Sequence, residues 1–342
     1  MTQLVDHLAD LTGFRDRDVL DVTLVGAFKD LLQPLSVAIY RCVGEPGNQR
    51  WLTRARLSAD DVVATADPSW TEIESLPLIA DHPERFQVYS RGGAVLLSEP
   101  AHVGMFPVAT DSDAVGVLEI HTAVALDEVA QRLIRSVLRI YCNFQALLDY
   151  SERDTLTGLL NRKTFDHSFL KATAESRMPV TTGSDDRRNV QPLGVYWIGV
   201  IDIDHFKRVN DNFGHLIGDE VLLLLARLMR SGFRIHDRLY RFGGEEFVVL
   251  MRCESEACAT LAFERFRVSM ERYPFPQVGQ ITVSIGFTEV TPGDTPSAAF
   301  ERADKAVYHA KGHGRNQVCS HAGLVASGEL TDASKVGDVE LF

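Results

Sequence analysis

Hydrophobic and polar positions in the first 125 residues form short stretches, which is typical of strands mixed with helical segments. Apolar runs of strand length occur in LSVAIYRC (35–42) and GGAVLLSE (92–99). A third stretch, residues 103–121, contains two β-rich runs separated by a polar Asp-Ser-Asp sequence. Because turn residues between two β-rich runs are typical of hairpins, we expect this third stretch to form one.

From Leu126 onwards the apolar residues recur at alternating steps of four and three, which predicts a helix with a coiled-coil seam. The seam consists of Leu126, Ala130, Leu133, Val137, Ile140, Phe144 and Leu147. A repeat of about 3.5 residues buries its apolar side chains best against the same helix of another chain. The pattern therefore predicts a homodimer through the Leu126–Leu147 helix, and the alternative that the stripe packs on its own domain stays open.

The helical pattern ends near residue 150, because Asp154 and Gly158 interrupt it before a second helical segment begins. Residues 178–190 are polar and have no period, which indicates a surface loop. They are followed by LGVYWIGVIDIDHF (193–206), an almost continuous apolar run of strand length. Such a run predicts a central strand that is buried on both faces.

Composition and charge narrow the class of protein. At 342 residues the chain is long enough for two domains, because a single core rarely grows past about 250 to 300 residues. Its 45% apolar and 24% charged residues are typical of a globular protein. The net charge of −12 disfavours binding to nucleic acid or to an anionic membrane, so a bound phosphate would need local cations or a metal.

The five cysteines are scattered and include no CxxC pair, which argues against a disulfide framework and against a structural zinc site. No apolar run reaches the roughly 18 to 20 residues that cross a bilayer, and the first residues are acidic rather than basic. We therefore expect a soluble protein of the cytoplasm with no membrane partner.

Carboxylates mark two places where chemistry is expected. Asp202 and Asp204 are two residues apart in the predicted central strand, and a buried carboxylate there requires a cation or a hard metal such as Mg²⁺. A salt bridge at the end of the strand is the alternative. Further on, Gly243 and Gly244 lie between two β-rich runs and precede Glu245 and Glu246. Glycines in such a hairpin allow a ligand phosphate to approach the backbone, although such a segment taken alone is more often an ordinary turn.

Six segments in order resemble the GGDEF family of diguanylate cyclases over about residues 150 to 320. They are DTLTGLLNRKTF (154–165), DIDHFKRVND (202–211), GHLIGDEVL (214–222), RFGGEEF (241–247), ITVSIGF (281–287) and ADKAVYHAKGHGRNQV (303–318). The resemblance implies an α/β fold of the α+β type, similar to a polymerase palm or nucleotidyl cyclase, with a mixed sheet flanked by helices. It also implies that two domains, each with one GTP, face each other and form cyclic di-GMP with release of pyrophosphate.

The resemblance assigns the signature acids to catalysis. Asp202 and Glu246 would hold Mg²⁺ or Mn²⁺, two ions in each active site, together with the backbone carbonyl of Ile203. Glu245 would assist the metal or accept the proton of the 3′-hydroxyl. Two metal ions facing a triphosphate can stabilise both the attacking and the departing oxygen.

The resemblance also assigns residues to the substrate. Asn210 and Asp219 would read guanine, because an amide and a carboxylate match its acceptor and donor edge. The residues expected to bind the phosphates are His205, Phe206, Lys207, Gly243, Gly244, Lys311 and Arg315. The basic members of this set supply the local cations that an acidic protein needs.

An inhibitory product site is implied by an RxxD motif, Arg234 and Asp237, which precedes the GGEEF turn at the offset found in many members of the family. Arg265 resembles the second arginine of that site. Arginine suits this role because its guanidinium group can clamp phosphate and stack on guanine. A surface ion pair is the alternative reading of these residues.

The predicted hairpin followed by a long exit helix looks like the end of a GAF domain, a sensory fold whose small ligand the sequence does not identify. We therefore divide the chain into a GAF-like sensory domain (1–125), a coiled-coil signalling helix (126–153), a GGDEF catalytic domain (154–322) and a flexible tail (323–342). Two other functions stay open: a receptor for cyclic di-GMP that has lost turnover, and a cyclase or polymerase acting on another nucleotide, which Asn210 and Asp219 disfavour.

Overall fold

The chain divides into two compact units, Met1–Ser151 and Glu152–Phe342, in a computed structural model. The structure describes residues 2–44, 47–68, 71, 73–99, 101–109, 114–175, 194–234 and 236–331. The loop predicted at 178–190 and the last residues of the predicted tail lie outside the described residues. Within the described ranges, no helix is both long and apolar enough to cross a membrane.

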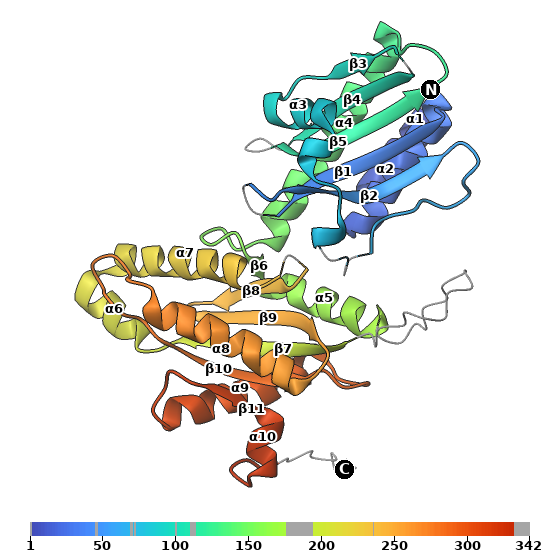
Figure 1. Ribbon diagram of the computed structural model, residues 1–342. Helices are drawn as coiled ribbons and strands as arrows, with labels where there is room; N and C mark the ends of the chain where they lie inside the picture. Colours follow the sequence, from blue (N-terminus) through green and yellow to red (C-terminus); the bar gives the residue numbers. More distant parts are fainter. Residues whose placement is uncertain are drawn as a thin grey trace. The chain divides into compact units, whose positions relative to one another are not determined.

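The N-terminal unit is built on a five-stranded antiparallel sheet in the order β2-β1-β5-β4-β3 (Figure 1). The strands are β1 (Ser36–Val43), β2 (Arg50–Ser58), β3 (Val95–Leu97), β4 (His102–Ala109) and β5 (Ala114–Thr122). The expected hairpin is β4 and β5, which pair in antiparallel register. The helices of this unit are α1 (Thr2–Gly13), α2 (Arg17–Leu32), α3 (Pro83–Arg91) and α4 (Glu128–Glu152), with two short 3-10 turns, η1 (Ile73–Ser75) and η2 (Ile79–Asp81).

Helices cover both faces of this sheet (Figure 1). On one face, Leu20, Leu24 and Phe28 of α2 recur every four residues and are buried with α1, α4 and the sheet. On the other face, Val88 of α3 packs with Trp51 of β2. The unit is therefore a helix–sheet–helix sandwich, and its assignment as a GAF-like domain stays a prediction.

Helix α4 contributes several residues to the core of its own unit, among them Ile134, Leu138 and Tyr141. Val137 of the predicted seam is buried in the same core, and Leu126, Leu133 and Phe144 are partly buried against it. Leu147 is the exception, with 65% of its surface exposed. Most of the stripe thus packs on its own domain, and the homodimer stays a prediction.

The C-terminal unit contains a six-stranded mixed sheet in the order β11-β10-β7-β9-β8-β6. Its strands are β6 (Leu160–Asn161), β7 (Val195–Ile203), β8 (Arg238–Gly243), β9 (Glu246–Cys253), β10 (Val283–Glu289) and β11 (Val318–Ser320). The pairs β10–β11 and β6–β8 are parallel and the others antiparallel. The central buried strand expected from the apolar run is β7, which lies between β10 and β9.

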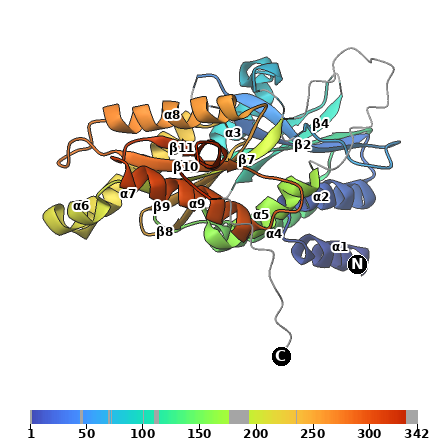
Figure 2. The ribbon, with the colours of Figure 1, turned by 90° about the horizontal axis from the view of Figure 1, so that it is seen from below.

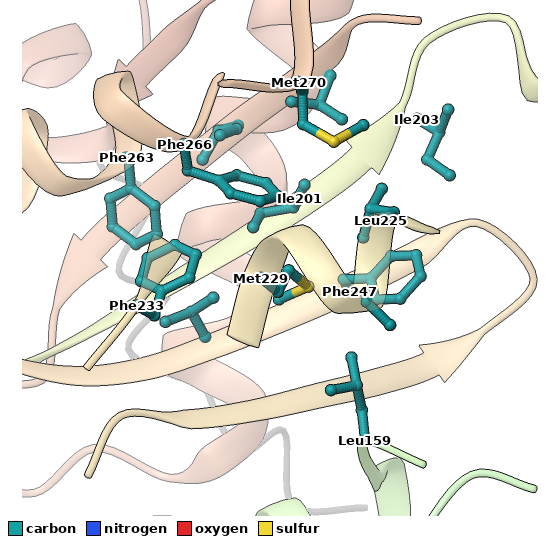
Figure 3. Close-up of a cluster of buried hydrophobic side chains, with 14 of the residues drawn as sticks. Leu159, Ile201, Ile203, Leu225, Met229, Phe233, Phe247, Phe263, Phe266 and Met270 are labelled. Atoms are coloured by element: carbon teal, nitrogen blue, oxygen red, sulfur yellow. The ribbon is translucent and has the colours of Figure 1, made fainter. Parts of the chain in front are cut away.

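Helices also cover both faces of the second sheet (Figure 2). They are α5 (Arg162–Glu175), α6 (Phe206–Phe213), α7 (His215–Gly232), α8 (Glu256–Arg272), α9 (Pro296–Gly312) and α10 (His321–Ala326). Figure 3 shows the core under α7 and α8, where Phe233, Phe263 and Phe266 pack together. On the opposite face α5 and α9 enclose a second cluster with Phe165, Phe169 and residues of β8 and β9.

Residues 323–331, predicted as the start of a flexible tail, instead continue the C-terminal unit. Leu324 of α10 is buried with Ala306 and Ala310 of α9. The imidazole Nε2 of His309 lies 2.8 Å from a carboxylate oxygen of Glu329. The tail prediction missed this helix because its few apolar residues show no clear period by themselves.

Candidate active site

The predicted signature acids meet at one edge of the C-terminal sheet. Asp202 near the end of β7 pairs directly with Glu246 at the start of β9. Glu245 occupies the turn before β9, after Gly243 and Gly244. Gly243 and Gly244 have positive φ angles of 141° and 52°. Only glycine adopts the first of these two angles without strain. The glycine pair therefore turns the chain so that both glutamates lie beside the end of β7.

Asp202 is 6% exposed and accepts a 2.7 Å salt bridge at Oδ2 from the ammonium group of Lys311. Burial raises the pKa of its carboxyl group; Lys311 opposes this effect, whereas Glu246 and Asp204 add to it. Its other oxygen, Oδ1, is buried and has no hydrogen-bond partner. A buried carboxylate oxygen without a partner is unfavourable unless a cation or donor arrives.

Negative charge accumulates at this edge of the sheet. Burial raises the pKa of Glu245, and the nearby carboxylates of Asp202 and Glu246 raise it further against the charge of Lys311. Hard divalent cations prefer carboxylate and carbonyl oxygens, so these acids with the orphaned Oδ1 of Asp202 fit such an ion. In the part of the chain that the structure describes, no group of three acidic, histidine or cysteine side chains forms a metal site. A further ligand would therefore come from backbone, as expected for Ile203, or from substrate.

Arg241 and Asp154, which the site prediction missed, hold the turn between β8 and β9 that carries Glu245. Arg241 donates from Nε and Nη2 to the carbonyl of Gly244, at 3.2 and 2.9 Å. Its Nη1 also forms a 3.0 Å salt bridge with Asp154, which in turn accepts from the hydroxyl of Thr157. Asp154 and Arg241 both lie inside segments that resemble the GGDEF family, so the arginine two residues before Gly243 could have been selected from the sequence.

The chain reverses immediately after β7. His205 adopts a left-handed φ of 59° and lies at the N-terminal cap of α6. Phe206 is buried in the core, whereas Lys207 is exposed. The predicted phosphate-binding backbone of His205 and Phe206 is thus the amino end of a helix, where free N–H groups favour anions.

Asn210 and Asp219 lie on consecutive helices, α6 and α7, which pack on each other. A Cβ atom at Gly218 would lie 2.0 Å from Oδ1 of Asn210. Because Gly218 has no side chain, the amide of Asn210 has room next to the position that precedes Asp219. Asn210 is half-buried and Asp219 is exposed.

Lys311 and Arg315 flank the end of α9. The turn after the helix contains Gly314, Arg315 and Asn316 with positive φ angles of 108°, 64° and 44°. The N–H of Arg315 donates to the carbonyl of Ala310 at 2.9 Å. This turn leaves Arg315 exposed while Lys311 reaches Asp202.

Asp204, the second carboxylate of the strand, has a different environment from Asp202. It is 6% exposed and accepts hydrogen bonds from the hydroxyls of Thr282 and Ser284, both at 2.7 Å, and from the N–H of Asn316 at 3.0 Å. Both carboxylate oxygens of Asp204 therefore have hydrogen-bond donors, and neither a metal nor the salt bridge considered above is needed to balance its burial. Its role is to join β7, β10 and the turn after α9.

The three residues of the predicted inhibitory site also meet. The N–H of Arg234 donates to Oδ2 of Asp237 at 2.8 Å, and Arg265 donates to the carbonyl of Gly232 at 2.8 Å. Burial raises the pKa of Asp237 to about 6, although the charges of Arg234 and Arg265 oppose the shift. Oδ1 of Asp237 is buried without a hydrogen-bond partner, so this carboxyl group can still accept a donor from a ligand.

The C-terminal part of this chain is similar to known proteins. The family model described as "Diguanylate cyclase, GGDEF domain" matches residues 151–317. The chain is 39% identical over 168 residues to diguanylate cyclase DgcP of Pseudomonas aeruginosa, covering 48% of this chain and 23% of DgcP. It is 38% identical over 186 residues to response regulator PleD of Caulobacter vibrioides, covering 53% of this chain and 38% of PleD. The chain thus spans well under half the length of these curated relatives.

Among solved structures, the GGDEF domain of DgcB from Caulobacter crescentus in complex with c-di-GMP is 33% identical. That match covers 50% of this chain and 96% of the DgcB chain, with a TM-score of 0.44. The matched region coincides with the C-terminal unit, which carries all of the site residues described above. Residues 151–317 of this chain therefore match the GGDEF domain family of diguanylate cyclases.

Proposed function

We propose that this protein is a diguanylate cyclase, which condenses two GTP molecules into cyclic di-GMP and releases two pyrophosphates. The observation that carries the proposal is the direct pairing of Asp202 with Glu246 at one sheet edge, with Glu245 and Lys311 beside them. Four charged side chains converge there within the region that matches the GGDEF domain family. A receptor that had lost turnover would have no need to keep this cluster.

Asp202 and Glu246 would hold Mg²⁺ or Mn²⁺, with the carbonyl of Ile203. Such an ion would lower the cost of the charge that develops on the α-phosphate and on the departing pyrophosphate. Lys311 neutralises Asp202 in this structure. Once Asp202 binds a cation, the ammonium group of Lys311 would be released towards the triphosphate. Glu245, whose carboxyl pKa is raised, would then accept the proton of the 3′-hydroxyl.

The remaining predicted residues would select and orient GTP. Asn210 and Asp219 would hydrogen bond with guanine, since an amide and a carboxylate complement its edge. The amino end of α6, with Lys207, and the turn that carries Arg315 would bind the phosphates. These groups come from separate elements, so the substrate would be bound on several sides.

Turnover of Glu246→Gln tests this proposal. The substitution keeps the size of the side chain and removes the charge, so we expect the formation of cyclic di-GMP to fall at least about a hundredfold with an unchanged fold. Glu220→Gln, an exposed position on α7, is the matched control and should retain activity. Equal turnover in the two variants would contradict the assignment of Glu246.

We further propose that the Arg234–Asp237–Arg265 cluster binds the product and inhibits the enzyme. Its support is the buried, unpartnered oxygen of Asp237, a carboxyl group that is influenced by the charges of both Arg234 and Arg265. Arg234→Ala should relieve the early stalling of product formation, and Arg139→Ala, an exposed arginine on α4, is the control. Stalling at the same product concentration in both variants would contradict an inhibitory role.

The N-terminal unit is proposed to be a GAF-like sensor for a small ligand, and α4 to join two chains in a homodimer. Support comes from the sheet flanked by helices and from the direct continuation of α4 to Glu152 without a Gly/Ser linker. Because each product contains two GTP-derived halves, two catalytic domains would have to meet. A sensor on the same helix could control that meeting.

A further inference from the structure

Asn316 connects the turn after α9 to two other parts of the C-terminal unit. Its N–H donates to Oδ2 of Asp204 at 3.0 Å, which ties the turn to the end of β7. Its side-chain amide donates to Glu271 and accepts from Nη1 of Arg267, both at 2.8 Å. Glu271 and Arg267 lie on α8, far from the turn in the sequence.

These contacts are held in place by further bonds on each side. On one side, Thr282 and Ser284 of the β10 region donate to both oxygens of Asp204. On the other side, Arg267 donates to Glu271 at 3.1 Å and to Glu264 at 2.8 Å, within α8. The partners of Asn316 are therefore also held by bonds that do not involve the turn.

The backbone of the turn requires such an anchor. Arg315 and Asn316 are consecutive left-handed residues, and this conformation costs free energy for residues other than glycine. Asparagine tolerates it better than most, and its side chain can hydrogen bond locally. Because Arg315 immediately precedes Asn316, the anchor also fixes the backbone position from which the side chain of Arg315 extends.

We propose that Asn316, held by Asp204 and by the Arg267–Glu271 pair, is a positioning residue that sets the phosphate-binding turn of the cyclase. This role rests on the function proposed above, since it assumes that Lys311 and Arg315 face the triphosphate of GTP. Asn316 acts through these two cations and does not touch the reacting atoms.

A charge placed at position 316 tests the role. In Asn316→Asp the new carboxylate can still accept from Arg267, but it lies against the carboxylate of Glu271 and displaces the turn. The Asn316→Asp/Glu271→Gln double variant restores the lost pairing, because the glutamine amide can donate to the aspartate. Glu271→Gln alone retains an acceptor for Asn316 and serves as the matched control.

The measurement is the Kd of the full-length chain for a non-hydrolysable GTP analogue with Mg²⁺, together with kcat, KM and the melting temperature. We expect Asn316→Asp to weaken binding and raise KM by about tenfold, the effect of one or two lost hydrogen bonds, with a smaller change in kcat. In the double variant, Kd and KM should return to within about twofold of the wild-type values, because the lost hydrogen bond is restored.

Unchanged affinity in Asn316→Asp, or a double variant as weak as the single one, would overturn the positioning role. A lower melting temperature with normal affinity would show that Asn316 is only structural, which also overturns it. A wild-type chain that binds no GTP analogue would overturn the proposed function, and this role with it.

Discussion

Among single residues, Asp237 is a carboxyl group whose pKa is strongly changed by burial. Burial raises its pKa from 3.8 to about 6, so the folded protein holds the proton more tightly than the unfolded chain does. The direction of the pH dependence of stability follows from this difference in pKa. The favourable contribution of protonated Asp237 is complete below about pH 4 and is lost as the pH rises to about 6.

Asp237→Asn should therefore remove part of the pH dependence of stability. Between about pH 4 and pH 6, the free energy of unfolding of wild type should fall relative to that of the variant, by at most about 3 kcal/mol. Chemical denaturation of both proteins at several pH values measures the difference. Parallel pH profiles would mean that the carboxyl group titrates normally.

Residues inside motifs were predictable where their chemistry is local, and not where their partners are distant. Asp202 and Glu246 stood out because carboxylates in a buried strand and beside a glycine turn are unusual. The role of Asp204 depends on Thr282 and on Asn316, more than seventy residues away. A hydrogen bond between such positions follows from the tertiary fold, which one sequence does not reveal.

At the scale of elements, the contact between α9 and β10 positions the cationic side of the active site. A Cβ atom on Gly286 of β10 would lie 2.2 Å from the carbonyl oxygen of Ala303 and 2.3 Å from the nitrogen of Val307. These are backbone atoms of α9, which cannot move without shifting the helix. Glycine therefore brings α9, and with it Lys311, close to the sheet.

Gly286→Ala should push α9 away from β10. We expect a loss of about 3 kcal/mol in the stability of the C-terminal unit and a larger relative loss of GTP turnover. Gly232→Ala is the control, because its Cβ atom would make an ordinary 3.5 Å contact with Phe266. Calorimetric unfolding and turnover of both variants make the comparison, and similar behaviour of the two would refute this account of the contact.

An element was predictable where its apolar pattern fits only one packing environment, and less so where the pattern fits several. The run at 193–206 identified β7 because a continuous apolar strand fits only the centre of a covered sheet. The stripe on α4 was compatible with a partner chain or with its own domain, since periodicity defines an apolar face but not what covers it. Tyr141 and Leu148, outside the predicted seam, turned out to carry much of the packing.

At the scale of the whole molecule, the proposed reaction requires two catalytic domains. Helix α4 still exposes large apolar side chains on the face away from its own core, with Val129 75%, Leu147 65% and Tyr150 79% exposed. Isolated exposed apolar residues are common, but these three recur along one face of a helix. We propose that a second copy of the chain covers this face.

Leu147→Glu would place a charge in that contact. We expect the chain to become monomeric and its specific activity to fall at least about tenfold at equal concentration, because a desolvated carboxylate is costly. Arg135→Glu, exposed elsewhere on α4, should have little effect. Sedimentation velocity and turnover provide the two readings, and an active monomer would contradict a dimer through α4.

The most direct test of the central claim is the stoichiometry of the reaction of the purified chain with GTP and Mg²⁺, with products separated by chromatography and identified by mass. The account predicts one cyclic di-GMP and two pyrophosphates for every two GTP consumed, with little turnover of ATP. The account would be contradicted by a chain that binds cyclic di-GMP but makes none from GTP, or by one that converts ATP faster than GTP.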